Sequence, residues 1–176
     1  MEQFVKFYFK EGENRKIKLY CDMDSVLTSW DDAFKNLGKE HNEGLTGEEY
    51  EKKYGSEKFW KLIDEVGGLE FWSEMPWTED GKELWSYIKK FNPTILSAPS
   101  KQEICPKGKD IWVDRELGKD VPRIYEKEKY IHADENSLLI DDDKNKIADW
   151  VSKGNGIGIL HTSTDKTIKE LKEHGL

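Results

Sequence analysis

The chain has 176 residues, of which 36% are charged and 36% hydrophobic, and its formal net charge is -8. This length suits one domain with a packed core and a small insertion. The acidic charge argues against a protein that grips long nucleic acid, because such proteins usually present a basic face. No signal peptide is evident, and no apolar run is long enough to span a bilayer. We therefore expect a cytoplasmic protein with no membrane or long nucleic-acid partner.

The N-terminal residues alternate between apolar and polar side chains. Val5, Phe7 and Phe9 share one face, a polar turn follows at 11–14, and apolar residues resume at Ile17. This pattern predicts two strands around a turn, with residues 1–15 as an added hairpin strand. The second strand, 16–21, runs directly into Asp22.

Residues 30–91 follow the helical period. We expect helices over 30–37, from Thr46 with its capping box, over 56–66 with a stop at Gly67 and Gly68, and over 78–91. A single crossover connection between two parallel strands does not need a helical stretch of this length. We interpret residues 30–75 as a small helical cap inserted after the first motif strand.

From residue 94 onward the pattern alternates between strand and helix. Strands are predicted over 94–97, 123–125, 137–140 and 156–161, with helices over 101–117, 145–153 and 165–174 between and after them. This alternation predicts an α/β fold whose doubly wound parallel sheet is covered on both faces. Its core would comprise 1–29 and 76–176.

Polar residues follow the apolar strands at the places where open α/β sheets bind ligands. Asp22 and Asp24 flank Met23 at the end of the first strand. One carboxylate can attack phosphorus while the other handles the leaving-group proton. Ser97, followed by Ala98, ends the next strand, where its hydroxyl can donate to a phosphate oxygen. A solvated acidic turn and a helix N-cap are the ordinary alternatives.

Three successive carboxylates, Asp141 to Asp143, end the strand at 137–140. They repel one another unless a cation lies between them, and Mg²⁺ prefers oxygen ligands of this kind. An acidic helix start would explain them equally. Lys127 and Lys129 precede them, and either ammonium could offset the charge of a phosphate or stand in a solvated loop.

The order Asp-x-Asp, strand-end Ser, Lys and Asp-Asp resembles the haloacid dehalogenase superfamily over residues 16–172. The resemblance implies a doubly wound core, a cap and an aspartyl-phosphate intermediate. Asp22 would be the nucleophile and Asp24 the general acid and base. Ser97 and Lys129 would hold the phosphoryl oxygens.

The same resemblance implies a Mg²⁺ cofactor. Its ligands would be Asp22, the backbone carbonyl of Asp24, and either Asp141 or Asp142, with Asp142 preferred.

A narrower set of residues resembles the 5'(3')-deoxyribonucleotidase family, including its phage and bacterial members. The set is Trp30 after the first motif, Phe71 and Trp72 before Pro76, and Lys109 after Ser97. The resemblance implies that these aromatic residues shape a pocket for base and sugar, that Ala98 borders it, and that Lys109 adds a phosphate contact. Two residues depart from the family pattern: Ser25 stands where glycine is common, and Ala98 where a second hydroxyl is frequent.

The expected activity is therefore hydrolysis of a nucleoside monophosphate. Two alternatives remain open: the same chemistry on a sugar phosphate or a nucleic-acid 3'-phosphate, and a nucleotide-binding module without turnover. The aromatic residues could equally serve the core. The sequence also leaves open a homodimer.

Overall fold

The computed structural model of the chain describes residues 16–176, and the predicted first hairpin strand lies outside them. Five parallel strands form one sheet in the order β3-β2-β1-β4-β5. Their bounds are β1 Lys18–Cys21, β2 Thr94–Ser97, β3 Arg123–Tyr125, β4 Ser137–Asp141 and β5 Ile157–Leu160. Because β1 lies between β2 and β4, the winding direction reverses at its carboxyl end, which confirms the doubly wound sheet.

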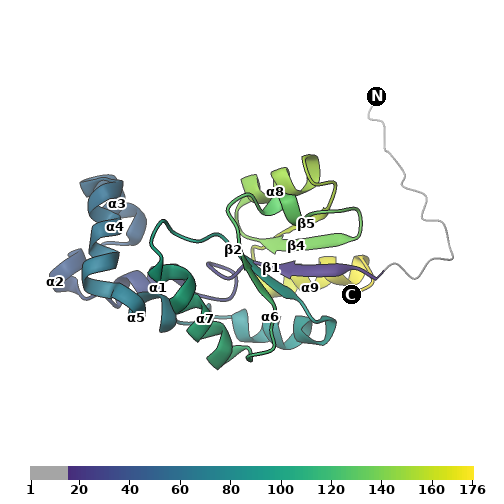
Figure 1. Cartoon of the computed structure of the whole chain (residues 1–176), viewed down its shortest axis with the longest axis horizontal. Coiled ribbons are helices and arrows are strands. Elements are labelled where there is room, and N and C mark those ends of the chain that lie inside the picture. The colour runs from purple at the N-terminus through teal and green to yellow at the C-terminus, as the bar shows by residue number, and fades with distance from the viewer. Residues whose placement is uncertain (1–15) are drawn as a thin grey trace.

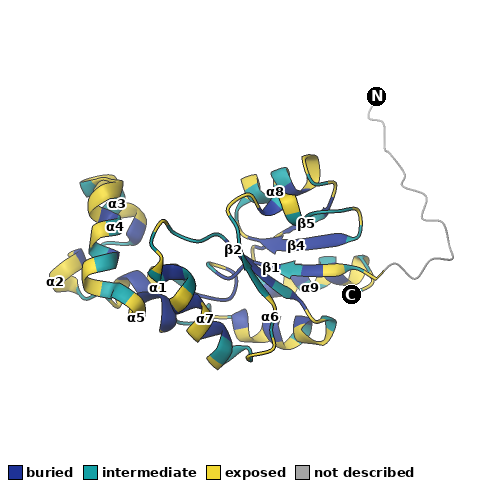
Figure 2. Ribbon diagram, in the orientation of Figure 1, coloured by how far each residue is buried: buried dark blue, intermediate teal, exposed yellow. Residues whose placement is uncertain are grey.

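Helices cover both faces of this sheet (Figure 1). Leu138 and Ile140 of β4 belong to a core that includes residues of α6 (Gly81–Ile88), α7 (Ile104–Glu116) and α9 (Thr164–Glu173). Leu139, with the opposite orientation, packs with Trp150 of α8 (Lys144–Ser152) on the other face. Figure 2 shows β4 buried along its length, as a two-sided core requires.

Short helices connect β1 to α6. They are α1 Trp30–Lys35, α2 Lys39–Asn42, α3 Gly47–Tyr54, α4 Ser56–Leu62 and α5 Gly68–Ser73. Thr46 forms the predicted capping box with Glu49 at the start of α3. The arrowheads of β1 and β4 in Figure 1 point toward this helical group, so it lies past the carboxyl ends of the strands. Its division from the core as a cap of residues 30–75 stays a prediction.

The predicted helix over 56–66 ends differently from the expectation. After α4 the chain makes a π-helical turn, Ile63–Gly67, and α5 begins at Gly68. Gly68 has φ +53°, a backbone angle that glycine adopts without steric cost. The glycine pair therefore redirects the helix and does not open a loop.

Helix α5 packs closely against α7. A Cβ added to Gly108 would lie 2.3 Å from Cβ of Trp72 and 3.1 Å from the carbonyl oxygen of Leu69. Only glycine permits this approach of the two backbones. The contact places the next residue, Lys109, beside the ends of the strands. No helix within residues 16–176 combines the length and the hydropathy that crossing a membrane requires.

Candidate active site

Asp22 directly follows β1, and its backbone N–H donates to the carbonyl oxygen of Ile140, 2.9 Å away. The parallel pairing of β1 with β2 and β4 brings Asp22, Ser97 and Asp141 to one edge of the sheet. The side chain of Asp22 is almost fully buried, and its Oδ1 accepts from the N–H of Met23 at 2.7 Å. The three strand ends predicted from the sequence therefore meet in space.

Lys129 joins two of these carboxylates. Its Nζ lies 2.9 Å from Oδ1 of Asp22 and 2.7 Å from Oδ2 of Asp141, and the lysine is 2% exposed. Burial by itself would lower the pKa of Lys129, but the charges of Asp22 and Asp141 raise it above its ordinary value. Lys127, the other candidate, is exposed. Of the two lysines, the structure brings Lys129 into the cluster.

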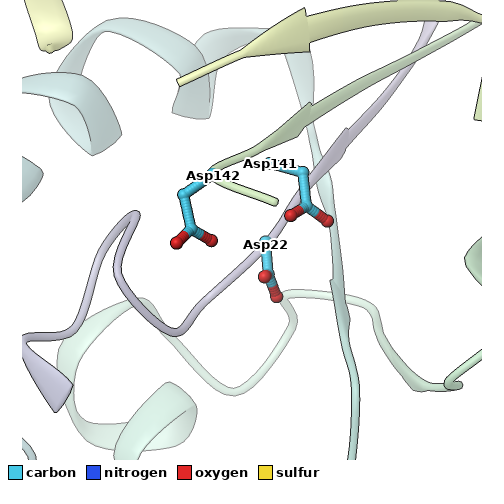
Figure 3. A group of neighbouring side chains, drawn as sticks. All are labelled: Asp22, Asp141 and Asp142. Carbon is cyan, nitrogen blue, oxygen red and sulfur yellow. The ribbon is translucent and has the colours of Figure 1, made fainter. Parts of the chain in front are cut away.

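Three carboxylates converge beside this lysine. Figure 3 shows the side chains of Asp22, Asp141 and Asp142 gathered at the strand ends, and one oxygen from each lies within 4.8 Å of the others. Burial, followed by the charge of Asp22, raises the pKa of Asp141 to about 6. Burial and the charges of Asp22 and Asp141 raise the pKa of Asp142 to about 7. The three carboxylates together therefore carry more negative charge than the single ammonium of Lys129 offsets.

These residues fit Mg²⁺. The donors are hard carboxylate oxygens, and a divalent cation among them would relieve the repulsion that raises their pKa values. Both oxygens of Asp141 are engaged, one by Lys129 and one by the N–H of Asp143 at 2.9 Å. Asp142 as a residue is exposed although its carboxylate is partly withdrawn from water, whereas Asp141 is fully buried. This arrangement favours Asp142 as the direct ligand.

Lys109 forms the second ion pair of the site. Its Nζ donates to Oδ2 of Asp24 at 2.5 Å, to Oγ of Ser97 at 2.8 Å and to the carbonyl oxygen of Ala98 at 3.3 Å. It also lies 5.4 Å from the ring centroid of Trp72, within cation–π range. Lys109 is fully buried. The family resemblance implies a phosphate contact for Lys109, and the structure places this lysine between Asp24 and the strand-end Ser97.

The turn after Asp24 has an unusual backbone. Ser25 has φ +60°, and its N–H donates to the carbonyl oxygen of Thr28 at 2.7 Å. This left-handed conformation explains why glycine suits the position. Thr28, which sequence reasoning missed, is buried, and its Oγ1 lies 3.1 Å from the carbonyl oxygen of Met23 and 3.4 Å from Oδ1 of Asp24. A threonine in a turn gives no distinctive sequence signal, so these contacts of Thr28 with the turn around Asp24 could not be predicted.

The predicted base-binding aromatic residues pack on one another. Trp30 lies 5.0 Å from Phe71 and 5.5 Å from Trp72, measured between ring centroids. Phe71 and Trp72 are 5% and 1% exposed, whereas Trp30 is half-buried. The structure thus places Phe71 and Trp72 mainly in the core, with Trp72 beside Lys109, and Trp30 nearer the surface. Contact of these rings with a base stays a prediction.

Comparison with known proteins bears on the fold. No family model matches the sequence, and no curated protein does. A HAD-superfamily hydrolase of subfamily IA, variant 1, from Geobacter sulfurreducens PCA superposes with a TM-score of 0.59 at 10% identity, covering 91% of this chain and 99% of that one. A hydrolase from Streptococcus pneumoniae TIGR4 gives the same TM-score and identity, covering 90% and 99%. The chain therefore has the α/β fold of these hydrolases.

Proposed function

We propose that this chain is a magnesium-dependent phosphatase that hydrolyses nucleoside monophosphates to nucleoside and phosphate. The observation that carries the proposal is one cluster of opposite charges at the strand ends. In it Lys129 joins Asp22 to Asp141, and Lys109 joins Asp24 to Ser97. The fold shared with bacterial hydrolases supports hydrolysis as the class of reaction.

Asp22 is the proposed nucleophile. Its Oδ1 is held by the Met23 N–H and by Lys129, so we assign the attack to Oδ2. A bond forms from this oxygen to phosphorus while the bond from phosphorus to the leaving oxygen breaks. Asp24, which enters this step in its protonated form, gives its proton to that oxygen, and the product is an aspartyl phosphate on Asp22.

Asp24 then reverses its role. It takes a proton from water, the water oxygen bonds to phosphorus, and the bond between Asp22 and phosphorus breaks to release phosphate. Lys109, Ser97 and Lys129 hold the phosphoryl oxygens through these steps. Asp22, the Asp24 backbone carbonyl and Asp142 would hold Mg²⁺, which when bound supplies positive charge to the phosphoryl oxygens.

The test is phosphate release from 5'- and 3'-mononucleotides, 2-deoxyribose 5-phosphate, phenyl phosphate and an oligonucleotide 3'-phosphate, with Mg²⁺ and with chelator. We expect chelator-sensitive release from mononucleotides, abolished in Asp22→Asn and reduced roughly 10²–10⁴-fold in Asp24→Asn. Asp31→Asn, an exposed carboxylate on α1, is the matched control and should keep full activity.

Each other outcome has a definite meaning. Robust turnover by Asp22→Asn would contradict the mechanism. Preference for the oligonucleotide or the sugar phosphate would keep the mechanism and replace the substrate. Tight mononucleotide binding without release, in excess Mg²⁺, would indicate a binding module.

A further inference from the structure

One hydrogen bond joins the helical group α1–α5 to the loop that follows β2. Asp64 lies in the π-helical turn Ile63–Gly67, and Gln102 lies on the loop 98–103, which begins directly after Ser97. Nε2 of Gln102 donates to Oδ2 of Asp64 at 2.5 Å. Figure 1 shows the loop running from the sheet toward the helical group. We call this hydrogen bond the clasp.

The amide of Gln102 is oriented by its own loop. Oγ of Ser100 donates to Oε1 of Gln102 at 2.9 Å, and the N–H of Gln102 donates to Oγ of Ser100 at 3.3 Å. The N–H of Ser100 in turn donates to Sγ of Cys105, in the first turn of α7, at 3.4 Å. Because Oε1 is engaged within the loop, Nε2 faces Asp64. The clasp is therefore coupled to the conformation of the whole loop.

The other end of the loop borders the charge cluster. Nζ of Lys109 donates to Oγ of Ser97 at 2.8 Å and to the carbonyl oxygen of Ala98, the first residue of the loop, at 3.3 Å. A shift of the loop would move these acceptors, and Lys109 is fully buried, so water cannot readily replace them. The loop thus links the clasp to two of the residues that hold the phosphoryl oxygens in the proposed reaction.

The clasp can open at little cost in free energy. Oδ1 of Asp64 is withdrawn from water and has no hydrogen-bond partner in the described part of the chain. Such an acceptor is costly, which offsets part of what the hydrogen bond to Oδ2 contributes. Burial accordingly raises the pKa of Asp64, while the hydrogen bond from Gln102 acts in the opposite direction. Opening would hydrate both oxygens. The π-helical turn that carries Asp64 is a structure that frequently marks functional sites.

We propose that Asp64 and Gln102 are positioning residues, whose hydrogen bond holds the loop 98–103 so that Ser97 and Lys109 are in place for the phosphoryl group. This inference rests on the proposed phosphatase function. Without the clasp, the substrate itself must bring the loop into place. The apparent affinity then falls by the fraction of molecules in which the loop is correctly placed. Saturating substrate restores the loop, so kcat is retained.

The first test is the steady-state kinetics of Asp64→Ala on a 2'-deoxyribonucleoside 5'-monophosphate. We expect KM to rise about tenfold and kcat to stay within about twofold of the wild type. Asp64→Asn keeps an oxygen that accepts from Gln102 and should retain the wild-type KM. Glu65→Ala is the matched control, since the side chain of Glu65 is exposed, and it should change neither value. Thermal unfolding of each variant checks that it folds.

A reversed pair distinguishes the clasp from a general effect of substitution. In Gln102→Glu two carboxylates face each other, so the clasp should break and KM should rise as in Asp64→Ala. Adding Asp64→Asn supplies an amide N–H₂ group that donates to the introduced carboxylate, and KM should return toward the wild-type value. Two independent structural defects would instead add their effects.

Tryptic cleavage tests the clasp without catalysis. Lys101 is exposed on the loop next to Gln102, so the rate of cleavage after Lys101 follows the population of molecules in which the loop is released. We expect this rate to be about tenfold higher in Asp64→Ala than in the wild type. Cleavage after Lys119, an exposed lysine in a turn outside the loop, should be unchanged. Since Gln102→Glu alters the cleaved bond, its rate is compared with that of the double variant, which should be lower.

Three results would overturn the inference while leaving the phosphatase proposal in place. Equal cleavage after Lys101 in the wild type and Asp64→Ala would mean that the clasp does not hold the loop. Faster cleavage with an unchanged KM would mean that the loop does not position the site. A fall in kcat at constant KM would indicate a loss of folded enzyme.

If the wild type releases phosphate from no mononucleotide, the proposed function fails, and the affinity for inorganic phosphate in the presence of Mg²⁺ replaces KM. Calorimetry should then show phosphate binding about tenfold more weakly to Asp64→Ala than to the wild type. Equal affinities, or no binding to the wild type, would overturn the inference.

Discussion

Nζ of Lys129 lies 2.9 Å from Oδ1 of Asp22, and both side chains are removed from water. The same ammonium also pairs with Asp141, so one cation serves two buried carboxylates. Removing one partner from such a group leaves uncompensated charge inside the protein, which usually costs more than the group contributes when it is intact.

Replacement of Lys129 by methionine tests this relationship. We expect Lys129→Met to lower the free energy of unfolding by about 3 kcal/mol without metal, because Asp22 and Asp141 would face each other unpaired. Mg²⁺ should restore part of this loss, since it supplies the missing charge. Urea unfolding with and without Mg²⁺ measures both effects.

Lys127→Met is the matched control, because Lys127 is an exposed lysine two residues away. It should unfold like the wild type under both conditions. If both variants behaved alike, the assignment of Lys129 to the charge cluster would be wrong.

Asp142 should dominate metal affinity. In Asp142→Asn we expect Mg²⁺ to bind at least about tenfold more weakly. The metal-free protein should become more stable at neutral pH, because the variant removes a carboxylate whose pKa is raised to about 7 by burial and by the charges of Asp22 and Asp141. Calorimetric titration with Mg²⁺ measures the affinity. Asp143→Asn provides the comparison, since the side chain of Asp143 caps α8 by accepting from the Asn145 N–H. Equal losses in the two variants would contradict a direct role for Asp142.

Ser25 should tolerate glycine well. Its φ of +60° costs an L-residue roughly 1–2 kcal/mol, and its side chain is exposed, so little contact is lost on truncation. After the greater chain entropy of unfolded glycine is subtracted, we expect Ser25→Gly to stabilise the protein by about 0.5–1 kcal/mol. Ser25→Ala, which keeps the strain, should give no gain. Chemical unfolding of the two variants distinguishes relief of strain from a general effect of truncation.

His161 should make the stability depend on pH. It follows β5, is 8% exposed, and its Nδ1 lies 2.9 Å from Oγ1 of Thr167. Burial lowers the pKa of His161, although the charge of Asp80 acts in the opposite direction. Below about pH 6.5, the ordinary value for histidine, the unfolded chain therefore takes up a proton that the folded chain resists. The contribution of His161 to stability is therefore lost as the pH falls from there toward its folded pKa, whereas Asp141 and Asp142, whose pKa values are raised, act in the opposite direction over this interval.

Unfolding at pH 7.5 and pH 5.5 measures this dependence. His161→Gln should lose less stability across the interval than the wild type, because glutamine does not titrate. His41→Gln is the comparison, since the side chain of His41 is exposed to solvent in the folded state. A wild-type dependence retained in His161→Gln would assign the effect to other groups.

Much of the framework could be predicted because it is local. The strands at 94–97 and 123–125 agree with the structure residue for residue, since short segments with β-branched residues follow helical stretches there. The capping box at Thr46 is likewise a contact between near neighbours. Agreement was weaker at Gly67 and Gly68, where the helix turns and continues, because a π-helical turn has no clear sequence signature.

The same distinction between local and long-range contacts applies to the candidate site. The sequence by itself determined which polar residues stand at the strand ends, because the change from apolar to polar side chains occurs between consecutive residues. These residues are Asp22, Ser97 and Asp141. Only the tertiary structure decided that Lys129 pairs with Asp22, that both oxygens of Asp141 are engaged, and that Gln102 holds Asp64. These contacts join residues far apart in the chain. Their distances follow from the strand order and the packing of α5 on α7, which no local pattern contains.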